Sequence, residues 1–280
     1  MIQHRKQSGV VLIVVLWIVF LLTILLVGFT NVAKVERDAS LDIVQRATGR
    51  ASVEAVLSYL AALKDLGPET WNPILGQVLI IPNLQSVGVR FRVIPEDSYV
   101  SLNGADKETL QLLFSTLAPA LDRPDLLAET IVARRAGDES AGVAALPWSS
   151  VNELLLLDFV RPDAVQPVLC WLTADSEHEG VNERYAQPAL IKALYPDRSE
   201  SILATRGAQS DSASAQTSIP KSLSLRGPRA GDARFRVQVE VDSGRLMRHL
   251  EATITFDGAA GYRVVRWNEY NAFFDLDEQT

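Results

Sequence analysis

The chain has 280 residues, 48% of them hydrophobic, which suits one or two globular domains plus one apolar span. Its net charge of -7 argues against nucleic-acid binding, which needs basic surface to displace counterions, and against a peripheral grip on anionic lipid. Cys170 is the only cysteine, which excludes an intramolecular disulfide and a cysteine-based metal site; its apolar neighbours favour a buried, inert thiol over a nucleophile.

An uncharged run from Val10 to Ala33 follows directly on a short basic leader, residues 1–9. The apolar part, residues 10–29, would form a helix about 30 Å long, which is the thickness of a bilayer core. The run is too long for a secretory signal peptide, and no Ala-x-Ala site follows it. We therefore expect a retained membrane span over residues 10–30. Cations flank the run on both sides, so the positive-inside rule leans only slightly towards an inside N-terminus.

The helix is expected to continue beyond the membrane. Apolar residues recur at helical spacing from Val35 to Leu63, no proline interrupts them, and Gly67-Pro68 supplies a stop. This pattern predicts one helix over residues 10–66. A separate soluble helix joined by a short turn is the alternative, although no turn residues lie between the two halves.

Residues 67–97 are expected to form the first part of a sheet. Gln77 to Ile81 is a compact apolar run, and residues 87–94 alternate apolar and polar side chains, as a strand with one buried face does.

Residues 98–204 show helical patterns instead. Asp106 is suited to cap one helix, Pro124 to Arg135 forms another, and Ser150 with Glu153 makes a capping box. Further helices are expected over residues 162–172 and from Pro188 to Tyr195. Two similar three-residue segments, Ser101-Leu-Asn103 and Gly180-Val-Asn182, each precede an expected helix. Both asparagines are suited to form a turn, because their side chains can hydrogen-bond to nearby backbone groups.

Residues 205–224 are rich in Ser, Ala, Gln and Gly and are expected to form a flexible loop. Residues 225–280 then hold three strands, at 233–241, 246–256 and 261–270, with Ser243-Gly244 and Asp257-Gly258 as hairpin turns. Strands before and after a helical block suggest one antiparallel sheet interrupted by an insertion, which is an α+β fold.

No catalytic motif stands out. The three histidines are far apart in sequence, and the chain has no nucleophile elbow, phosphate-binding glycine loop or dinucleotide fingerprint. We therefore expect no enzyme, no catalytic residues and no bound organic cofactor. An acidic stretch offers Asp175, Glu177 and Glu179 as weak Ca²⁺ ligands. A solvated charged loop is the favoured alternative, because the EF-hand spacing is missing.

The leader Arg5-Lys6-Gln-Ser-Gly9, followed at once by Val10-Val-Leu-Ile-Val-Val, resembles a type IV prepilin signal. The whole chain resembles the type II secretion minor pseudopilin K family, general secretion pathway protein K. Matching elements are Ser101-Leu-Asn103, Ser150-Val-Asn-Glu-Leu154 and Gly180-Val-Asn182. The resemblance implies a type IV pilin-like fold, in which a long N-terminal helix packs on an antiparallel sheet, with a large all-helical domain inserted into that sheet.

The resemblance also implies processing. A prepilin peptidase would cut between Gly9 and Val10 and methylate the new N-terminus at Val10. The fifth mature position, where most pilins carry Glu, is Val14 here. Members of the K family typically lack that glutamate, and a subunit with no neighbour above it has less need of the carboxylate.

The implied role is a cap at the pseudopilus tip that starts assembly for protein export across the outer membrane. Implied partners are minor pseudopilins I and J, other pseudopilins, the prepilin peptidase and the inner-membrane secretion platform. The implied location is the inner membrane, single-pass, with a cytoplasmic N-terminus and a periplasmic head. Some family members bind Ca²⁺ in the helical domain. The alternatives are a minor tip pilin of a type IV pilus and a signal-anchored periplasmic enzyme or binding module.

Overall fold

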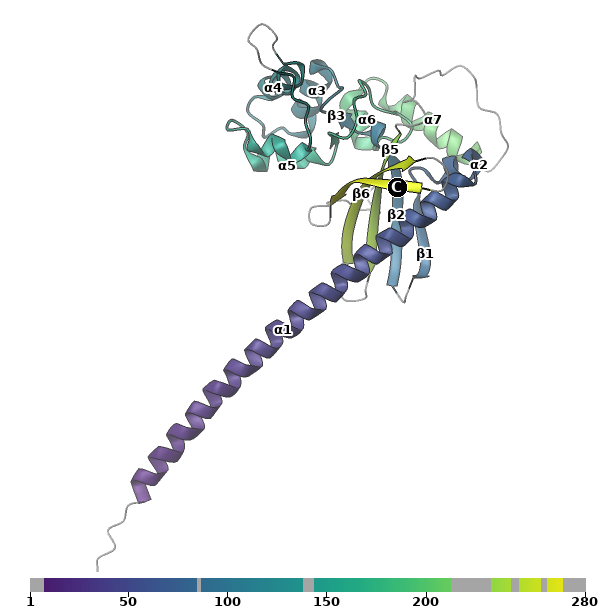
Figure 1. Ribbon diagram of the computed structural model, residues 1–280. Helices are drawn as coiled ribbons and strands as arrows, with labels where there is room; N and C mark the ends of the chain where they lie inside the picture. The colour runs from purple at the N-terminus through teal and green to yellow at the C-terminus, as the bar shows by residue number, and fades with distance from the viewer. Residues whose placement is uncertain are drawn as a thin grey trace, which may run out of the picture. The chain divides into compact units, whose positions relative to one another are not determined.

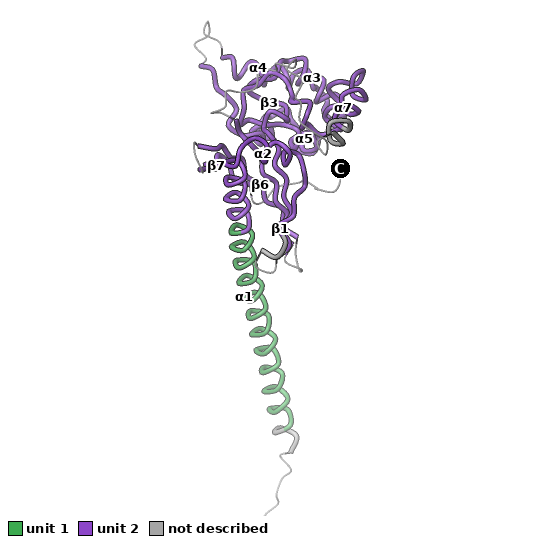
Figure 2. Tube along the Cα trace, turned by 90° about the vertical axis from the view of Figure 1, so that its right-hand side faces the viewer, with its two compact units in different colours: residues 1–51 green, residues 52–280 purple. Residues whose placement is uncertain are grey.

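The structure, a computed structural model, describes residues 8–84, 87–137, 144–212, 233–242, 247–257 and 261–268. Most of the leader, the part of the expected flexible loop after Ser212, the Ser243-Gly244 turn and Gly258 of the Asp257-Gly258 turn therefore lie outside the described residues. The chain divides into two compact units, Met1–Ala51 and Ser52–Thr280, which are coloured separately in Figure 2. Helix α1, Ser8–Asp65, crosses the boundary between them.

The first unit contains the N-terminal part of α1, in which the residues from Leu12 to Phe29 are almost all apolar and are exposed. Leu12 is 71% exposed and Phe29 is 69% exposed. The two threonine hydroxyls within this stretch donate to backbone carbonyls of the preceding turn, Thr23 to Val19 at 2.8 Å and Thr30 to Leu26 at 3.0 Å. These polar groups are thus satisfied inside the helix, as a lipid environment requires. By length and composition, α1 is able to cross a membrane.

In the second unit, the last turns of α1 pack on a sheet. Val53, Val56, Leu57 and Leu60 are fully buried at the i, i+3, i+4 and i+7 positions of one helix face. The prediction of a single helix over residues 10–66 is confirmed within about two residues at each end. The helix ends at Asp65, two residues before Gly67, whose φ of 105° lies in the left-handed region that favours glycine.

The sheet contains five strands in the order β1-β2-β5-β6-β7, all antiparallel (Figure 1). Their bounds are β1 Val78–Leu84, β2 Val87–Pro95, β5 Arg234–Asp242, β6 Met247–Asp257 and β7 Gly261–Asn268. Alternate residues face α1, for example Phe91 on β2 and Val239 on β5, which are register partners and fully buried. The α+β fold with an interrupted sheet is therefore confirmed, since β2 and β5 are neighbours separated by the whole insertion.

Three aromatic side chains pack together at the edge of this core, near the end of α1. Trp71, on the short helix α2 (Pro68–Trp71), meets Phe235 and Phe256 edge-on at ring-centroid distances of 5.2 and 5.1 Å. The Lys64 ammonium lies 4.7–5.2 Å from the centroids of these three rings. Cation–π attraction and the helix dipole both favour a cation at this position. Desolvation lowers the pKa of Lys64.

The insertion has a hydrophobic core of its own, around Leu110, Phe114, Leu127, Ile131 and Trp148. Asp106 caps the first helix as predicted, accepting from the Thr109 amide at 2.7 Å, and the Ser150–Glu153 capping box is present. The helices are α3 Lys107–Leu117, α4 Pro124–Ala136, α5 Pro162–Leu169, α6 Pro188–Leu194 and α7 Ser199–Ser212, with 3-10 turns at 72–74, 96–98 and 151–156.

Two expectations for the insertion were wrong. The helix expected over residues 162–172 ends at Leu169, because Leu172–Thr173 forms strand β4, paired in parallel with β3 (Val100–Ser101). The loop expected from residue 205 starts too early, because α7 extends to Ser212. Arg206 explains the extra turns, since its guanidinium donates to the Ala186 carbonyl at 2.7 Å and to the Glu183 carbonyl.

Replacing Leu57 with Ala should lower the free energy of unfolding of the head by about 2–5 kcal/mol, because the side chain is fully buried between α1 and the sheet. Leu66→Ala is the matched control, since Leu66 is 71% exposed and its loss should cost no more than about 0.5 kcal/mol. Chemical denaturation of both variants measures the difference. Equal losses would contradict the packing of α1 described above.

Candidate functional site

The expected processing site lies at the start of α1. Gly9 and Val10 are both helical, within the first turn after Ser8. Val14 follows one turn later and is 51% exposed. Cleavage after Gly9 and methylation of Val10 remain predictions.

The insertion joins the sheet through a buried ion pair. The chain leaves β2 at Pro95 and returns in β5 at Arg234. At this joint the Arg236 guanidinium donates two hydrogen bonds to the Glu96 carboxylate, at 2.9 and 3.1 Å, and a third to the Leu172 carbonyl at 3.3 Å. Glu96 is 1% exposed and Arg236 is 8% exposed. The first residue of the insertion is thus tied to the strand on which the chain re-enters the sheet.

The environment of the pair holds both groups in their charged forms. Burial by itself would raise the pKa of Glu96, but the charge of Arg236 and hydrogen bonds from Arg236, Thr173 and Thr253 outweigh it and leave the pKa below its usual value. The guanidinium also lies over the Tyr99 ring, 3.8 Å from its centroid. The pair is therefore hydrogen-bonded as completely as a buried ion pair must be to persist.

Asn182, one of the two asparagines singled out by sequence, holds the neighbouring residue. Its side-chain amide contacts both carboxylate oxygens of Asp97 at 3.1 Å, and its backbone amide donates to the Asp97 carbonyl at 2.7 Å. Burial raises the pKa of Asp97 despite the hydrogen bond from Asn182. The side-chain oxygen of Asn182 also accepts from the Arg184 amide, so the expectation of a turn-forming asparagine is confirmed.

Asn103, the second asparagine, connects three segments of the insertion. Its side-chain amide donates to the carbonyls of Trp148 and Ala174, at 2.9 and 3.0 Å, and its oxygen accepts from the Trp148 amide at 2.8 Å. The next residue, Gly104, lies against the backbone of Glu177 and His178. No space remains there for a side chain.

The three acidic residues proposed as Ca²⁺ ligands do not come together. Among the described residues, no three His, Cys, Asp or Glu side chains are grouped as a metal site requires. The Asp175 carboxylate pairs instead with Arg266 on β7 at 2.9 Å, while Glu177 and Glu179 are exposed. The calcium expectation therefore finds no support at these residues, and Asp175 contributes to the joint between insertion and sheet.

Cys170 is exposed, so the expectation of a buried residue was wrong. Cys170 follows the last residue of α5, in the two-residue turn that leads to β4. The thiol lies 3.4 Å from the Pro167 carbonyl, and desolvation raises its pKa to about 11. A thiol of this kind stays protonated near neutral pH, which agrees with the expectation that it is inert.

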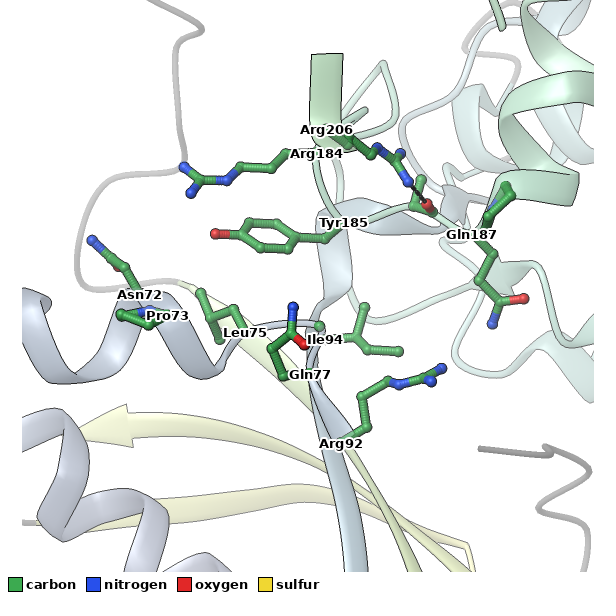
Figure 3. A pocket seen from close by; sticks show the side chains of 13 residues that line it. Asn72, Pro73, Leu75, Gln77, Arg92, Ile94, Arg184, Tyr185, Gln187 and Arg206 are labelled. Carbon is green, nitrogen blue, oxygen red and sulfur yellow. Dashed lines mark hydrogen bonds between the residues drawn. The ribbon is translucent and has the colours of Figure 1, made fainter. Parts of the chain in front are cut away.

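A cavity of about 420 Å³ opens between the β1–β2 end of the sheet and the segment before α6 (Figure 3). Its apolar surface includes Leu75, Ile94 and the Tyr185 ring. Its charged lining is formed by arginines, Arg92, Arg184 and Arg206.

Sequence reasoning missed both the ion pair and the cavity. Glu96 and Arg236 are 140 residues apart in the sequence. The local sequence around each residue would look the same if its side chain were exposed to solvent near the end of a strand. The cavity arginines come from β2, the segment before α6 and α7, so no local spacing signals them.

The long N-terminal helix, the five-stranded antiparallel sheet and the helices inserted between β2 and β5 define a pilin-like α+β fold. No family model and no curated protein matches the sequence. Among solved structures, the chain is similar to one from the GspK-GspI-GspJ complex of the type 2 secretion system of enterotoxigenic Escherichia coli, with 14% identity and a TM-score of 0.48. The match covers 84% of this chain and 100% of that one. A likeness this distant transfers no residue roles.

Replacing Glu96 with Gln should destabilise the head by about 3–5 kcal/mol, because Arg236 would lose the charge of its buried partner. Asp163→Asn is the matched control, since the Arg161–Asp163 pair is exposed and its loss should cost less than about 1 kcal/mol. Urea unfolding of both variants measures the two losses. A similar small effect for each would contradict the role assigned to the joint.

The pH dependence of stability should carry the signature of Glu96. Its folded-state pKa lies below the unfolded value, so its stabilisation is fully present above about pH 4.5 and is lost as the pH falls through the folded pKa. Urea unfolding of the native protein between pH 3 and 7 should therefore show a steeper acid loss than unfolding of Glu96→Gln. Parallel curves would contradict the assignment.

Replacing Gly104 with Ala should destabilise the insertion, since the new Cβ would overlap the His178 carbonyl oxygen and the Glu177 carbonyl carbon. We expect a loss of about 1–3 kcal/mol or more, because backbone must move to relieve the overlap. Gly180→Ala, where a Cβ meets nothing within 4 Å, is the control. Thermal unfolding of the two variants checks the difference.

Proposed function

We propose that this chain is a minor pseudopilin of a type II secretion system that caps the pseudopilus tip and initiates its assembly. One observation carries the proposal. A basic leader ending in Gly9 is followed without a break by an uncharged run, and that run belongs to a single helix reaching Asp65. Scission after Gly9 would leave this helix in the mature protein, with Val10 as the methylated N-terminus.

The properties of α1 support the role of a subunit that first resides in a membrane and then assembles. Its apolar side chains from Leu12 to Phe29 are exposed on all sides, so they require cover by lipid or by other apolar helices. A tethered module needs such a helix only as an anchor. A pseudopilin needs it twice, in the inner membrane and then against neighbouring subunits.

The inserted helical domain supports a terminal position. A large domain between β2 and β5, fixed by the Glu96–Arg236 pair, would obstruct the stacking of another subunit. Val14 agrees with that position, because a subunit with none above it has less need of a carboxylate there. In this proposal minor pseudopilins I and J are the immediate neighbours, the prepilin peptidase and inner-membrane platform act earlier, and the head lies in the periplasm. The role assigned is structural, without catalysis.

Processing provides the sharpest test. In a host with an active prepilin peptidase, Gly9→Ala should abolish loss of the leader, because the scissile bond follows Gly9. Intact mass of membrane-purified protein should show residues 1–9 absent and one methyl group added in the native chain, and the full leader retained in the variant. Ser8→Ala, one position earlier, serves as the control and should be processed.

A native chain that keeps its leader in such a host would contradict the proposal and favour the signal-anchored module. A processed chain that co-purifies with type IV pilus subunits rather than with pseudopilins I and J would favour the minor tip pilin instead.

A further inference from the structure

The cavity of Figure 3 contains one arginine whose guanidinium makes no hydrogen bond or ion pair with the described part of the chain. Arg206 donates to two backbone carbonyls of the insertion, and the buried Arg92 already has interactions within the fold, so neither is assigned to a ligand. Arg184 is exposed, and its guanidinium lies over the Tyr185 ring, 5.3 Å from the centroid. None of the thirteen described lining residues is Asp or Glu. Arg184 is therefore a cation that an anionic ligand can reach.

Two neutral hydrogen-bond donors accompany Arg184. Figure 3 shows the Tyr185 hydroxyl and the Asn72 side-chain amide directed to the same end of the cavity as the Arg184 guanidinium. Neither of these two polar groups is hydrogen-bonded to another part of the chain that the structure describes. Burial raises the pKa of Tyr185, so its hydroxyl stays protonated near neutral pH and is able to donate.

One cation with two neutral donors matches a carboxylate. A guanidinium presents a planar pair of N–H groups that a carboxylate accepts in parallel, and Tyr185 and Asn72 can donate to its remaining lone pairs. A phosphate group carries a charge of about -1.5 to -2 near neutral pH, which a single guanidinium does not balance. The donors at this end of the cavity thus favour a carboxylate.

Apolar side chains line the cavity next to these donors. Leu75 and Ile94 are 8% and 3% exposed, and Figure 3 shows Leu75 beneath the Tyr185 ring in that view. Pro73 and Pro188 also belong to the lining. A ligand that carries an apolar group beside its carboxylate is therefore held better than a bare anion, because apolar surface is removed from water.

The same face of the sheet carries an exposed apolar residue near the cavity. Arg92 and Ile94 alternate with Phe91, which is buried against α1, so they lie on the opposite face. Ile80 pairs with Arg90 on that opposite face and is 67% exposed. It is two register positions from Arg92, about 7 Å along the strand.

An extended polypeptide accounts for both features. β1 is the outer strand of the sheet, and the lining residues Asn72, Gln77 and Arg184 are exposed, so a chain can enter the cavity while the head stays folded. A small anion would use the donors alone and would leave Ile80 in water. A peptide can place a carboxylate at Arg184 and cover Ile80 with another side chain.

We propose that the cavity binds an extended acidic segment of a partner polypeptide. An Asp or Glu carboxylate of that segment meets Arg184, Tyr185 and Asn72, and a neighbouring apolar side chain rests on Leu75. A further apolar side chain covers Ile80. Because the cavity walls come from both the insertion and the sheet, the bound segment contacts both parts of the head.

Binding of designed peptides to the full-length protein in detergent tests this assignment. The probe is a pool of fluorescein-labelled nonapeptides with a central Leu-Asp pair and mixed Thr and Val flanks. The control pool has Leu-Asn in the same place. Fluorescence anisotropy should show about tenfold tighter binding of the Leu-Asp pool, as charge-assisted hydrogen bonds to a carboxylate provide.

Substitutions in the cavity should change this preference. Arg184→Gln should remove most of it, and Tyr185→Phe, which keeps the ring, should reduce it by about threefold. Arg198→Gln is the matched control, because Arg198 is also exposed, lies 6.0 Å from the centroid of the Tyr195 ring and does not line the cavity. Ile80→Ser should weaken the binding of both pools alike.

Three results would overturn the proposal: equal affinity for the two pools, a preference that survives Arg184→Gln, and no binding of either pool. Displacement of the peptides by acetate or inorganic phosphate as readily as by unlabelled peptide would overturn it as well, because it would identify a site for small anions. The processing test at Gly9 is independent of these measurements, so the two proposals can fail separately.

Discussion

The structure depends most on the hydrogen-bonded ion pair between Glu96 and Arg236, because it lies where the inserted helices leave the sheet and where the chain returns. A large insertion between neighbouring strands costs little closure entropy, but it needs a fixed orientation if its surface is to serve assembly. The ion pair fixes the orientation of the insertion on the sheet, and the Leu172 carbonyl and the Tyr99 ring make further contacts with Arg236. Asn182 on Asp97 and Arg266 on Asp175 repeat the same design, in which polar side chains join the insertion to its surroundings.

Helix α1 meets two different demands with one continuous backbone. Its first half satisfies every threonine hydroxyl internally and presents apolar side chains around its whole circumference. Its last turns are amphipathic and bury one face, led by Leu57 and Leu60, against alternate residues of the strands. That continuity is why processing at Gly9 would convert a membrane-anchored chain into an assembly subunit, as proposed.

The arginines of the head have two kinds of surroundings. Arg236, Arg206 and Arg266 are bonded to carboxylates or carbonyls of the insertion and act as structural ties. Arg184 and Arg92, together with Arg206, line the cavity of Figure 3, whose apolar surface includes Leu75, Ile94 and the Tyr185 ring. The same residue type therefore both joins the insertion to its surroundings and lines a cavity.

The sequence by itself determined whatever depends on local periodicity. The uncharged run, the amphipathic continuation to Asp65, the Asp106 cap, the Ser150–Glu153 capping box and the alternation of the late strands all follow from neighbouring residues, and each matches the structure. Prediction from the sequence failed where contacts between distant residues determine the local structure. In α7, Arg206 bonds to the carbonyls of residues 183 and 186, and the helix extends into the expected loop. Strand β4 forms by pairing with β3 where a helix end was expected. Only the tertiary structure decided that Glu96 meets Arg236, that Asp175 pairs with Arg266 rather than joining a calcium site, and that three arginines share a cavity. The physical reason is that these contacts join residues tens to more than a hundred positions apart, and their energy exists only once the sheet register has brought them together.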